Sequence, residues 1–390
     1  MLIPATFDSI RPFEADELPQ AYDRLEQDKQ FRAIVAYLYP QVPFEAVMRQ
    51  MRGCTTCFDF QKTFCYPFLK QLMAKASTGL TFDGHSIGLQ PASAPTNGQP
   101  PRFTFVSNHR DIVLDSALLD VLLIDAGLDT TCEIAIGDNL LAAPWIKDLV
   151  RINKSFIVER SLPPREMLAA SKRMSDYMHF VVQQKHDNIW IAQREGRAKD
   201  SNDRTQPAIL KMMAMGGEGT VVERLKQLHI VPLAISYEYD PCDFLKAREF
   251  QLKRDIAGWK KTKQDDVESM RTGILGYKGH VHYHCAPCID SWLDTLPQDM
   301  PKGEFFDTVA AHIDQEIHRH YRLYATNRVA AGADSTAEER DAFETYVEGQ
   351  LDKIRLDHPD RTFLRQCLID MYANPLRNAL KARTNTSRHQ

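Results

Sequence analysis

A histidine followed closely by two carboxylates is the first place in the sequence where side chains can do chemistry. His109 precedes Asp111 and Asp115. The pKa of a histidine ordinarily lies near 6.5, so its ring can act as a general base near neutral pH, and a neighbouring carboxylate can hold it in one tautomer. The same histidine can also do no more than cap a helix. Both interpretations fit this stretch taken alone.

A second group of charged side chains follows two other apolar segments. Arg160 ends one of them, and the other leads into a cluster that contains Glu195, Gly196, Arg197 and Lys199. A guanidinium can bind phosphate through two parallel N–H groups, and a glycine lets a substrate approach the backbone closely. An ordinary exposed loop can have the same charged composition. Here, however, cationic side chains follow an apolar segment twice, and this repeated position favours phosphate binding.

The elements around these residues predict where they lie. Residues 103–107 alternate like a buried strand, and apolar residues from 112 to 123 recur at helical spacing. A strand therefore gives way to a helix at 108–111, and such junctions lie at the mouth of a sheet in α/β proteins. The same patterns predict strands over 132–136, 156–160, 188–193 and 229–239, and helices over 143–150, 165–185, 207–215 and 218–228. The alternation predicts an α/β fold in which helices cover both faces of a mixed sheet.

Both ends of the chain add helices to this core. We expect a helical N-terminal region over 1–79, an α/β domain over 80–325 and a C-terminal helical extension over 336–380. Residues 91–101, rich in Pro, Ala and Gly, predict a surface loop. The charged stretch 243–267 predicts a solvated helical insertion, and 278–289 predicts a strand.

Composition narrows the classes of function. The chain has 390 residues, 43% of them hydrophobic, and its 48 basic and 52 acidic side chains give a formal charge of −4. This balance weighs against a nucleic-acid partner, since such proteins usually carry a basic excess. Eight cysteines without a signal-like N-terminus fit a reducing compartment. Apolar runs stay below about 18 residues, so we expect no membrane-spanning helix, while attachment to a membrane surface stays open.

Two patterns admit a metal ion, and for both we favour the interpretation without one. The first consists of two Cys-x-x-Cys pairs far apart in sequence, which we interpret as small buried hydrophobic residues: Cys54, Cys57, Cys285 and Cys288. The second consists of three histidines spaced by two along a predicted strand, which fit a polar strand face: His280, His282 and His284. The sequence also lacks the usual nucleotide-binding glycine motifs and the Gly-x-Ser-x-Gly of many serine hydrolases.

Taken in order, several short stretches between about residues 103 and 240 resemble the glycerol-phosphate acyltransferases, including the 1-acylglycerol-3-phosphate acyltransferases. The stretches are Ser107-Asn108-His109 with a following aspartate, Gly137-Asp138-Asn139-Leu140, Phe156 to Arg160, Glu195-Gly196-Arg197 and Val231-Pro232-Leu233. The chain departs from that family at two points. Five residues rather than four separate His109 from Asp115, which leaves Asp111 as a rival partner, and an arginine follows Gly196 directly, with Lys199 in place of a later cation.

The resemblance implies a reaction and roles. His109 would deprotonate an acceptor hydroxyl that attacks a fatty-acyl thioester, and Asp115 would orient the ring. Arg160, Arg197 and Lys199 would hold the acceptor's phosphate, and Glu195 would orient a cation or a second hydroxyl. Backbone amides near Gly196 can bind the developing oxyanion.

The same resemblance implies partners and a location. The cosubstrate would be acyl-CoA or acyl carrier protein, with no other cofactor and no metal. The acceptor would be glycerol-3-phosphate or its 1-acyl form, and the protein would be cytoplasmic and peripheral to the cytoplasmic membrane. Two alternatives stay open: a non-catalytic scaffold or lipid-binding protein of the same fold, and a hydrolase that uses the same histidine.

Overall fold

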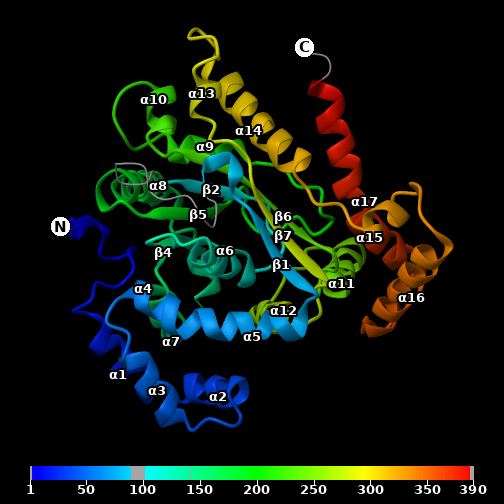
Figure 1. Cartoon of the computed structure of the whole chain (residues 1–390), viewed down its shortest axis with the longest axis horizontal. Helices are drawn as coiled ribbons and strands as arrows, with labels where there is room; N and C mark the ends of the chain where they lie inside the picture. Colours follow the sequence, from blue (N-terminus) through cyan, green and yellow to red (C-terminus); the bar gives the residue numbers. More distant parts are fainter. Residues whose placement is uncertain (1, 89–101, 142, 387–390) are drawn as a thin grey trace.

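The centre of the molecule is one mixed β-sheet (Figure 1). The computed structural model describes residues 2–88, 102–141 and 143–386. The sheet runs in the order β1-β7-β6-β2-β5-β3-β4. Its strands are β1 (Gly79–Asp83), β2 (Thr104–Ser107), β3 (Cys132–Gly137), β4 (Ser155–Val158), β5 (Asn188–Ala192), β6 (Ile230–Tyr237) and β7 (His280–Cys285). Neighbouring strands pair in parallel except β6 and β7, which are antiparallel.

Helices cover both faces of the sheet because its strands are apolar on both sides. On β2, for example, Val106 belongs to the core cluster under α8 (Pro164–Phe180), α9 (Pro207–Met213) and α14 (Lys302–Arg319). The neighbouring Phe105 belongs to the cluster under α5 (Tyr66–Ala76) and α6 (Leu114–Asp125). The predicted α/β class, a mixed sheet with helices on both faces, is confirmed.

The N-terminal helices form a smaller layer of their own, at the lower left in Figure 1. They are α1 (Leu18–Gln27), α2 (Lys29–Leu38), α3 (Phe44–Arg52), α4 (Cys57–Asp59) and a π-helical segment, Phe60–Cys65. Their apolar side chains surround Ile152 at the end of α7 (Pro144–Ile152). This contact attaches the layer to the helix between β3 and β4.

The remaining elements are short helices and turns between the strands, and the helices at the C-terminal end of the chain. They are the α-helices α10 (Val221–Lys226), α13 (Asp290–Leu293), α15 (Ala325–Ala330), α16 (Ala337–Lys353) and α17 (Arg361–Thr386), the 3-10 turns Ala5–Phe7, His85–Ile87 and Asp138–Leu140, and a π-helical end of α8, Val181–Lys185. The helices α16 and α17 share a core cluster with Ala247 of α11 (Asp243–Asp255).

The charged stretch after β6 corrects one prediction. It forms α11 and α12 (Lys263–Leu275), but α11 is not a solvated insertion, since Asp243, Lys246 and Glu249 are buried in it. Each of these charges has a partner from another segment: Lys246 pairs with Asp240, Glu249 with Lys199, and Asp243 accepts hydrogen bonds from Tyr346 and Tyr372. The composition could not indicate burial because the compensating groups lie elsewhere in the chain.

The structure also locates the two cysteine pairs and the three histidines that were considered for metal binding. Cys54 and Cys57 belong to the N-terminal core cluster, whereas Cys285 belongs to a cluster against the sheet, so the two pairs do not meet. On β7, His280, His282 and His284 share the partly exposed face, and burial lowers the pKa of His282 to about 4.

The predicted loop over 91–101 lies outside the described residues. Among the helices that the structure describes, none is both long and apolar enough to cross a membrane.

Candidate active site

The charged residues singled out in the sequence follow strands that end at one edge of the sheet. His109 follows β2, Arg160 follows β4, and the segment 195–199 follows β5. These strands run in the same direction, so their carboxyl ends share an edge. This is the edge at which parallel α/β sheets bind ligands.

His109 and Asp115 form a hydrogen-bonded pair at this edge. The imidazole Nδ1 lies 2.7 Å from Asp115 Oδ2. The aspartate side chain is fully buried and that of the histidine is 12% exposed, so the ring keeps some access to the surface. With Nδ1 engaged by the carboxylate, Nε2 is the nitrogen left for a substrate proton.

Backbone groups fix the carboxylate of Asp115. Its Oδ2 also accepts the N–H groups of Arg110, at 2.6 Å, and of Asp111, at 3.1 Å. These contacts hold the carboxylate in one position beside the imidazole. The phenol of Tyr283 donates to the backbone carbonyl of Asp115 at 2.9 Å, which ties the start of α6 to β7.

Asp111 does something different from Asp115. Its Oδ1 accepts the backbone N–H groups of Val113 and Leu114, both at 2.8 Å, so it caps the first turn of α6. Burial raises the pKa of this carboxyl group, and the nearby charge of Asp115 raises it further. The structure therefore pairs His109 with Asp115 across the five intervening residues, and Asp111 closes the turn between them.

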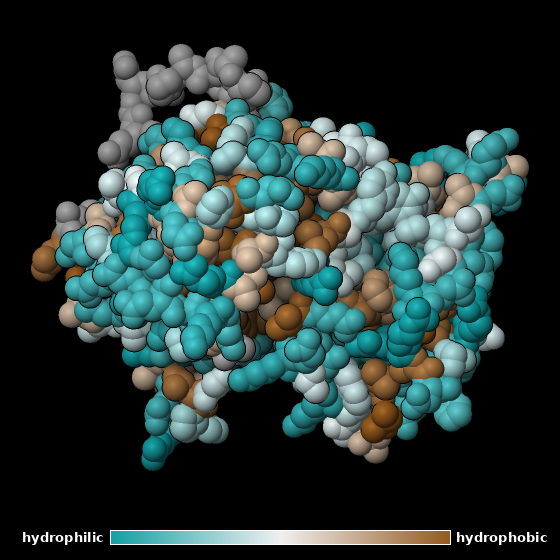
Figure 2. All heavy atoms as spheres, turned by 90° about the horizontal axis from the view of Figure 1, so that it is seen from below, coloured by the Kyte–Doolittle hydropathy of each residue, from teal (hydrophilic) through white to brown (hydrophobic). Residues whose placement is uncertain are grey.

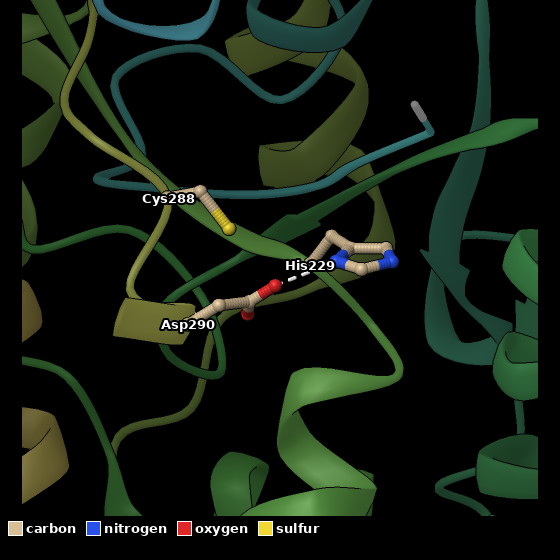
Figure 3. A group of neighbouring side chains, drawn as sticks. All are labelled: His229, Cys288 and Asp290. Atoms are coloured by element: carbon tan, nitrogen blue, oxygen red, sulfur yellow. Dashed lines mark hydrogen bonds and ion pairs between the residues drawn. The ribbon is translucent and has the colours of Figure 1, made fainter. Parts of the chain in front are cut away.

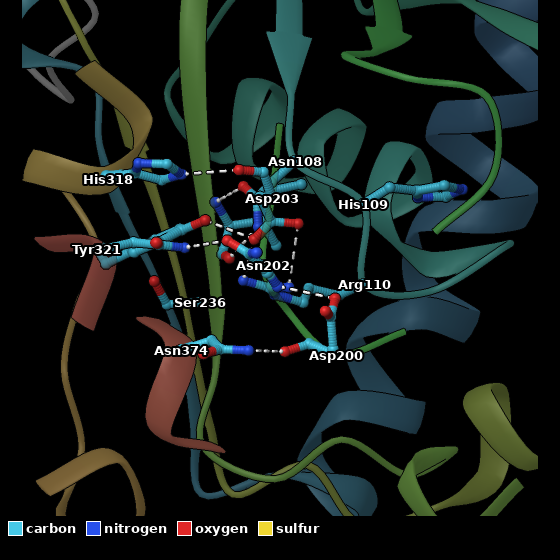
Figure 4. A network of polar contacts seen from close by, with 12 residues as sticks. Asn108, His109, Arg110, Asp200, Asn202, Asp203, Ser236, His318, Tyr321 and Asn374 are labelled. Atoms are coloured by element: carbon cyan, nitrogen blue, oxygen red, sulfur yellow. Dashed lines mark hydrogen bonds and ion pairs between the residues drawn. The ribbon is translucent and has the colours of Figure 1, made fainter. Parts of the chain in front are cut away.

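The residues on either side of His109 anchor it to the fold. Asn108 exchanges two hydrogen bonds with the backbone of Ile235, at 2.9 and 2.8 Å, and so continues the pairing of β2 with β6. Arg110 makes two bonds to the buried Asp203, at 2.7 and 3.3 Å, and Tyr321 donates to the same carboxylate. Figure 4 shows His109 pointing away from this network. The buried contacts of Asn108 and Arg110 thus fix the backbone on both sides of His109, while the imidazole is directed away from them.

An aromatic side chain packs against the histidine. The ring of Trp190 on β5 meets that of His109 edge to face, with 5.7 Å between centroids. The indole N–H donates to Ser107 Oγ at 3.0 Å, which fixes the orientation of the indole. The contact limits the ring positions open to His109.

Arg160 and Glu195 form the most accessible charged pair at this edge. Their side chains are 33% and 71% exposed, and Arg160 Nη1 lies 3.5 Å from Glu195 Oε1. Asp138 accepts the backbone N–H groups of Arg160 and Ser161, both at 3.1 Å, which fixes the exit from β4. The guanidinium lies beside Gly137, where a side chain would collide with Asn139 Oδ1.

The rest of the 195–199 segment turns toward α11. Gly196 has a left-handed backbone (φ 67°), and no described atom lies within 4 Å of the point where a side chain would begin, so the backbone is approachable there. Arg197 is partly buried, and its buried Nη1 has no hydrogen-bond partner among the described residues. Burial opposes its charge, but Cys242, Asp111 and other nearby acidic groups outweigh burial and raise its pKa.

Lys199 faces the same helix. It pairs with Glu249, and burial lowers the pKa of the lysine to about 8. The structure thus brings Arg160 together with Glu195 and brings Arg197 close to Asp111. It directs Lys199 to α11 instead.

Three residues that support the site gave no interpretable signal in the sequence. Asp203 and Tyr321 fix Arg110, and Lys246 donates to the carbonyl oxygen of Arg110 at 3.3 Å. They come from a loop, from the segment after α14 and from α11, so no local spacing links them to His109.

A family comparison agrees with this geometry. Residues 95–236, which include His109, Arg160 and the 195–199 segment, match the acyltransferase family. This match covers the segment that carries the site, which is less than half of the chain. The resemblance predicted from the ordered motifs is confirmed at this level, and the acyltransferase segment ends within β6.

Comparison with individual proteins adds less. No curated protein matches this chain. It is similar to a solved structure of the 1-acyl-sn-glycerophosphate (LPA) acyltransferase PlsC from Thermotoga maritima, with 11% sequence identity and a TM-score of 0.37 over 76% of this chain and 94% of that chain. At that level the likeness does not bear on the substrate.

Proposed function

We propose that the protein is an O-acyltransferase that moves a fatty acyl group from an acyl thioester to a hydroxyl of a phosphorylated glycerol. The observation that carries the proposal is the contact of His109 with a fully buried, backbone-fixed Asp115 inside the acyltransferase segment. A scaffold protein has no need of this pair. The carboxylate fixes the imidazole tautomer, which a general base requires.

The pair supports transfer in two steps. Nε2 of His109 takes the proton of the acceptor hydroxyl while that oxygen bonds to the thioester carbonyl carbon, and Asp115 stabilises the imidazolium that forms. The tetrahedral intermediate then expels the sulfur, which receives the proton from Nε2. An ester and a free thiol result. The chemistry uses side chains of this chain, the acceptor hydroxyl and the acyl donor, which is acyl-CoA or the acyl form of acyl carrier protein.

Arg160 is the best supported ligand for the acceptor's phosphate. Its guanidinium is partly exposed at the edge that carries His109, and its contact with Glu195 is long, so phosphate can compete for it. Arg197 adds positive charge near Asp111, where it is partly buried. Binding of a remote phosphate would orient the hydroxyl toward Nε2.

A membrane surface is where we propose that the acyltransferase meets its acceptor, on the cytoplasmic side. Several large apolar side chains are exposed on or next to α2 and α12: Ile34, Tyr37, Val42, Val267, Leu275 and Tyr277. Arg271 of α12 lies over the ring of Tyr37, so the two helices are neighbours. Figure 2, which views the molecule from below, shows hydrophobic patches among hydrophilic residues on this side. Apolar side chains beside cations suit a lipid interface.

The experiment compares wild type with His109→Ala. Each is assayed for acyl transfer to glycerol-3-phosphate and to its 1-acyl form in lipid vesicles, with acyl-CoA and acyl carrier protein as donors. We expect transfer by wild type and a loss of about 10²- to 10⁴-fold in the variant, the usual contribution of a general base. An unchanged thermal midpoint serves as the folding control.

Two outcomes would refute the proposal. Full transfer by His109→Ala would exclude the histidine as the base. Release of free thiol by wild type at the same rate with and without acceptor would identify a hydrolase.

A further inference from the structure

A second group of potential ligands lies at the opposite edge of the sheet. His229 comes directly before β6, Cys288 lies in the link that follows β7, and Asp290 begins α13. Because β6 and β7 are antiparallel, the start of one and the end of the other meet at one edge. Since β6 runs parallel to β2, that edge is the one away from His109.

The three side chains converge on one point. A nitrogen of His229, the sulfur of Cys288 and a carboxylate oxygen of Asp290 all lie within 4.8 Å of one another, and each residue is partly buried. Figure 3 shows the thiol directed toward the contact between the histidine and the aspartate, in which Nδ1 lies 2.6 Å from Oδ2.

One oxygen in the group has no partner. Asp290 Oδ1 is buried and accepts no hydrogen bond from the described residues. The nearby Lys226 is engaged by Asp294 instead, at 2.6 Å. A buried carboxylate oxygen without a donor is costly, and a cation would satisfy it.

The combination of donors selects the kind of cation. Thiolate and imidazole favour zinc over magnesium or calcium, and zinc also accepts carboxylate oxygen. Tetrahedral zinc with ordinary bond lengths holds its ligand atoms about 3.3 to 3.6 Å apart. The group reaches that arrangement through shifts of about 1 Å, in which the Nδ1 contact opens and Oδ1 becomes available.

A thiol nucleophile activated by the same histidine fits less well. In such a triad one ring nitrogen faces the carboxylate and the other faces the sulfur. Here Nδ1 faces Asp290, and Figure 3 shows Nε2 directed away from Cys288.

We propose that His229, Cys288 and Asp290 bind one Zn²⁺ ion, with water as the fourth ligand. The ion joins the start of β6, the link after β7 and the first turn of α13. Its role is to stabilise the fold, because the chemistry proposed for His109 lies at the other edge of the sheet.

The test measures zinc binding by the full chain. Metal-free protein is titrated with Zn²⁺ against a chromogenic chelator, and separately with Co²⁺ while the near-ultraviolet spectrum is recorded. We expect one ion per chain and a thiolate-to-cobalt charge-transfer band. Saturating zinc should also raise the thermal midpoint, since a ligand that binds only the folded state stabilises it.

Variants assign the ligands. Cys288→Ser, His229→Gln and Asp290→Asn should each weaken zinc binding by about 100-fold or more, because even residues that only support metal ligands contribute about 10- to 100-fold. Cys367→Ser on α17 is the matched control and should bind like wild type. His229 is 40% exposed, so its replacement keeps the test usable if Cys288→Ser fails to fold.

Two results would overturn the proposal. One is the absence of stoichiometric zinc binding by wild type. The other is binding that survives all three substitutions, which would assign the ion to other residues. Neither result bears on acyl transfer, which His109→Ala tests independently.

Discussion

The molecule contains two histidine–aspartate pairs of nearly equal length at opposite edges of one sheet. His109 Nδ1 lies 2.7 Å from Asp115, and His229 Nδ1 lies 2.6 Å from Asp290. Their surroundings differ. Asp115 is fully buried and its Oδ2 accepts two backbone N–H groups, whereas Asp290 is 23% exposed and lies next to a thiol.

A histidine–aspartate hydrogen bond by itself therefore does not indicate the function of the pair. Both carboxylates keep one buried oxygen without a partner among the described residues, so that feature does not separate them. The carboxylate of Asp115 is fixed through its other oxygen by two backbone N–H groups and orients an imidazole. A carboxylate with an unsatisfied oxygen next to sulfur and nitrogen can complete a coordination sphere. We therefore interpret the first pair as a proton-transfer site and the second as a metal site.

The largest expected effect comes from matched substitutions in the two pairs. Asp115→Asn should lower acyl transfer by about 10²-fold or more, because the amide no longer fixes the imidazole tautomer. Asp290→Asn should leave transfer within about twofold of wild type. Steady-state rates of the two purified variants provide the measurement, with circular dichroism to check folding. Equal losses in both variants would contradict the division of roles.

A smaller effect is expected from the charge that shares the edge with His109. Arg160→Ala should raise the KM for the phosphorylated acceptor about tenfold, because the loss of one charge-assisted hydrogen bond weakens binding by at least about that factor. The KM for the acyl donor should stay unchanged. Initial rates over a range of acceptor concentrations measure it. Arg165→Ala, whose side chain is 84% exposed, is the control. Equal KM values in the two variants would remove Arg160 from the phosphate site.

The last prediction concerns the stability of the support beneath the first pair rather than the rate of acyl transfer. His318 of α14 contacts the carbonyl oxygen of Asp203 through Nε2 at 3.1 Å, and burial lowers its pKa to about 4. Between pH 6.5 and 4 the unfolded chain binds the proton and the folded chain does not, so stability falls as the pH falls through this window. The loss from this group is at most about 3 kcal/mol.

His318→Gln should therefore reduce the acid sensitivity of folding. Urea unfolding at pH 7 and at pH 4.5 measures it, with the exposed His358→Gln as the control. A pH dependence identical to wild type would show that His318 is not buried as a neutral ring. His282 and His312, whose pKa values burial also lowers to about 4, keep the variant partly acid-sensitive.

Local pattern was enough to predict the elements around the active site. The strand–helix junction at His109 was predicted because alternation and helical spacing are properties of neighbouring residues. β2 ends at Ser107 and α6 begins at Leu114, on either side of that junction. The α/β class followed from the same alternation of strands and helices.

Partners distant in sequence could not be predicted in this way. The choice between Asp111 and Asp115 depended on how the turn before α6 closes, with Asp111 capping two N–H groups. The prediction that α11 is solvated was wrong because Lys199, which pairs with Glu249, and the tyrosines that donate to Asp243 come from remote segments. The zinc group likewise joins residues 229 and 288 through the antiparallel pairing of β6 with β7.

The sequence by itself therefore determined the class of fold, the ordered acyltransferase motifs and the residue types available for chemistry. Only the tertiary structure decided which carboxylate reaches which histidine and which charges are buried. The physical reason is that local periodicity depends on backbone geometry over a few residues, whereas desolvation and hydrogen bonding depend on groups that folding brings together from remote parts of the chain.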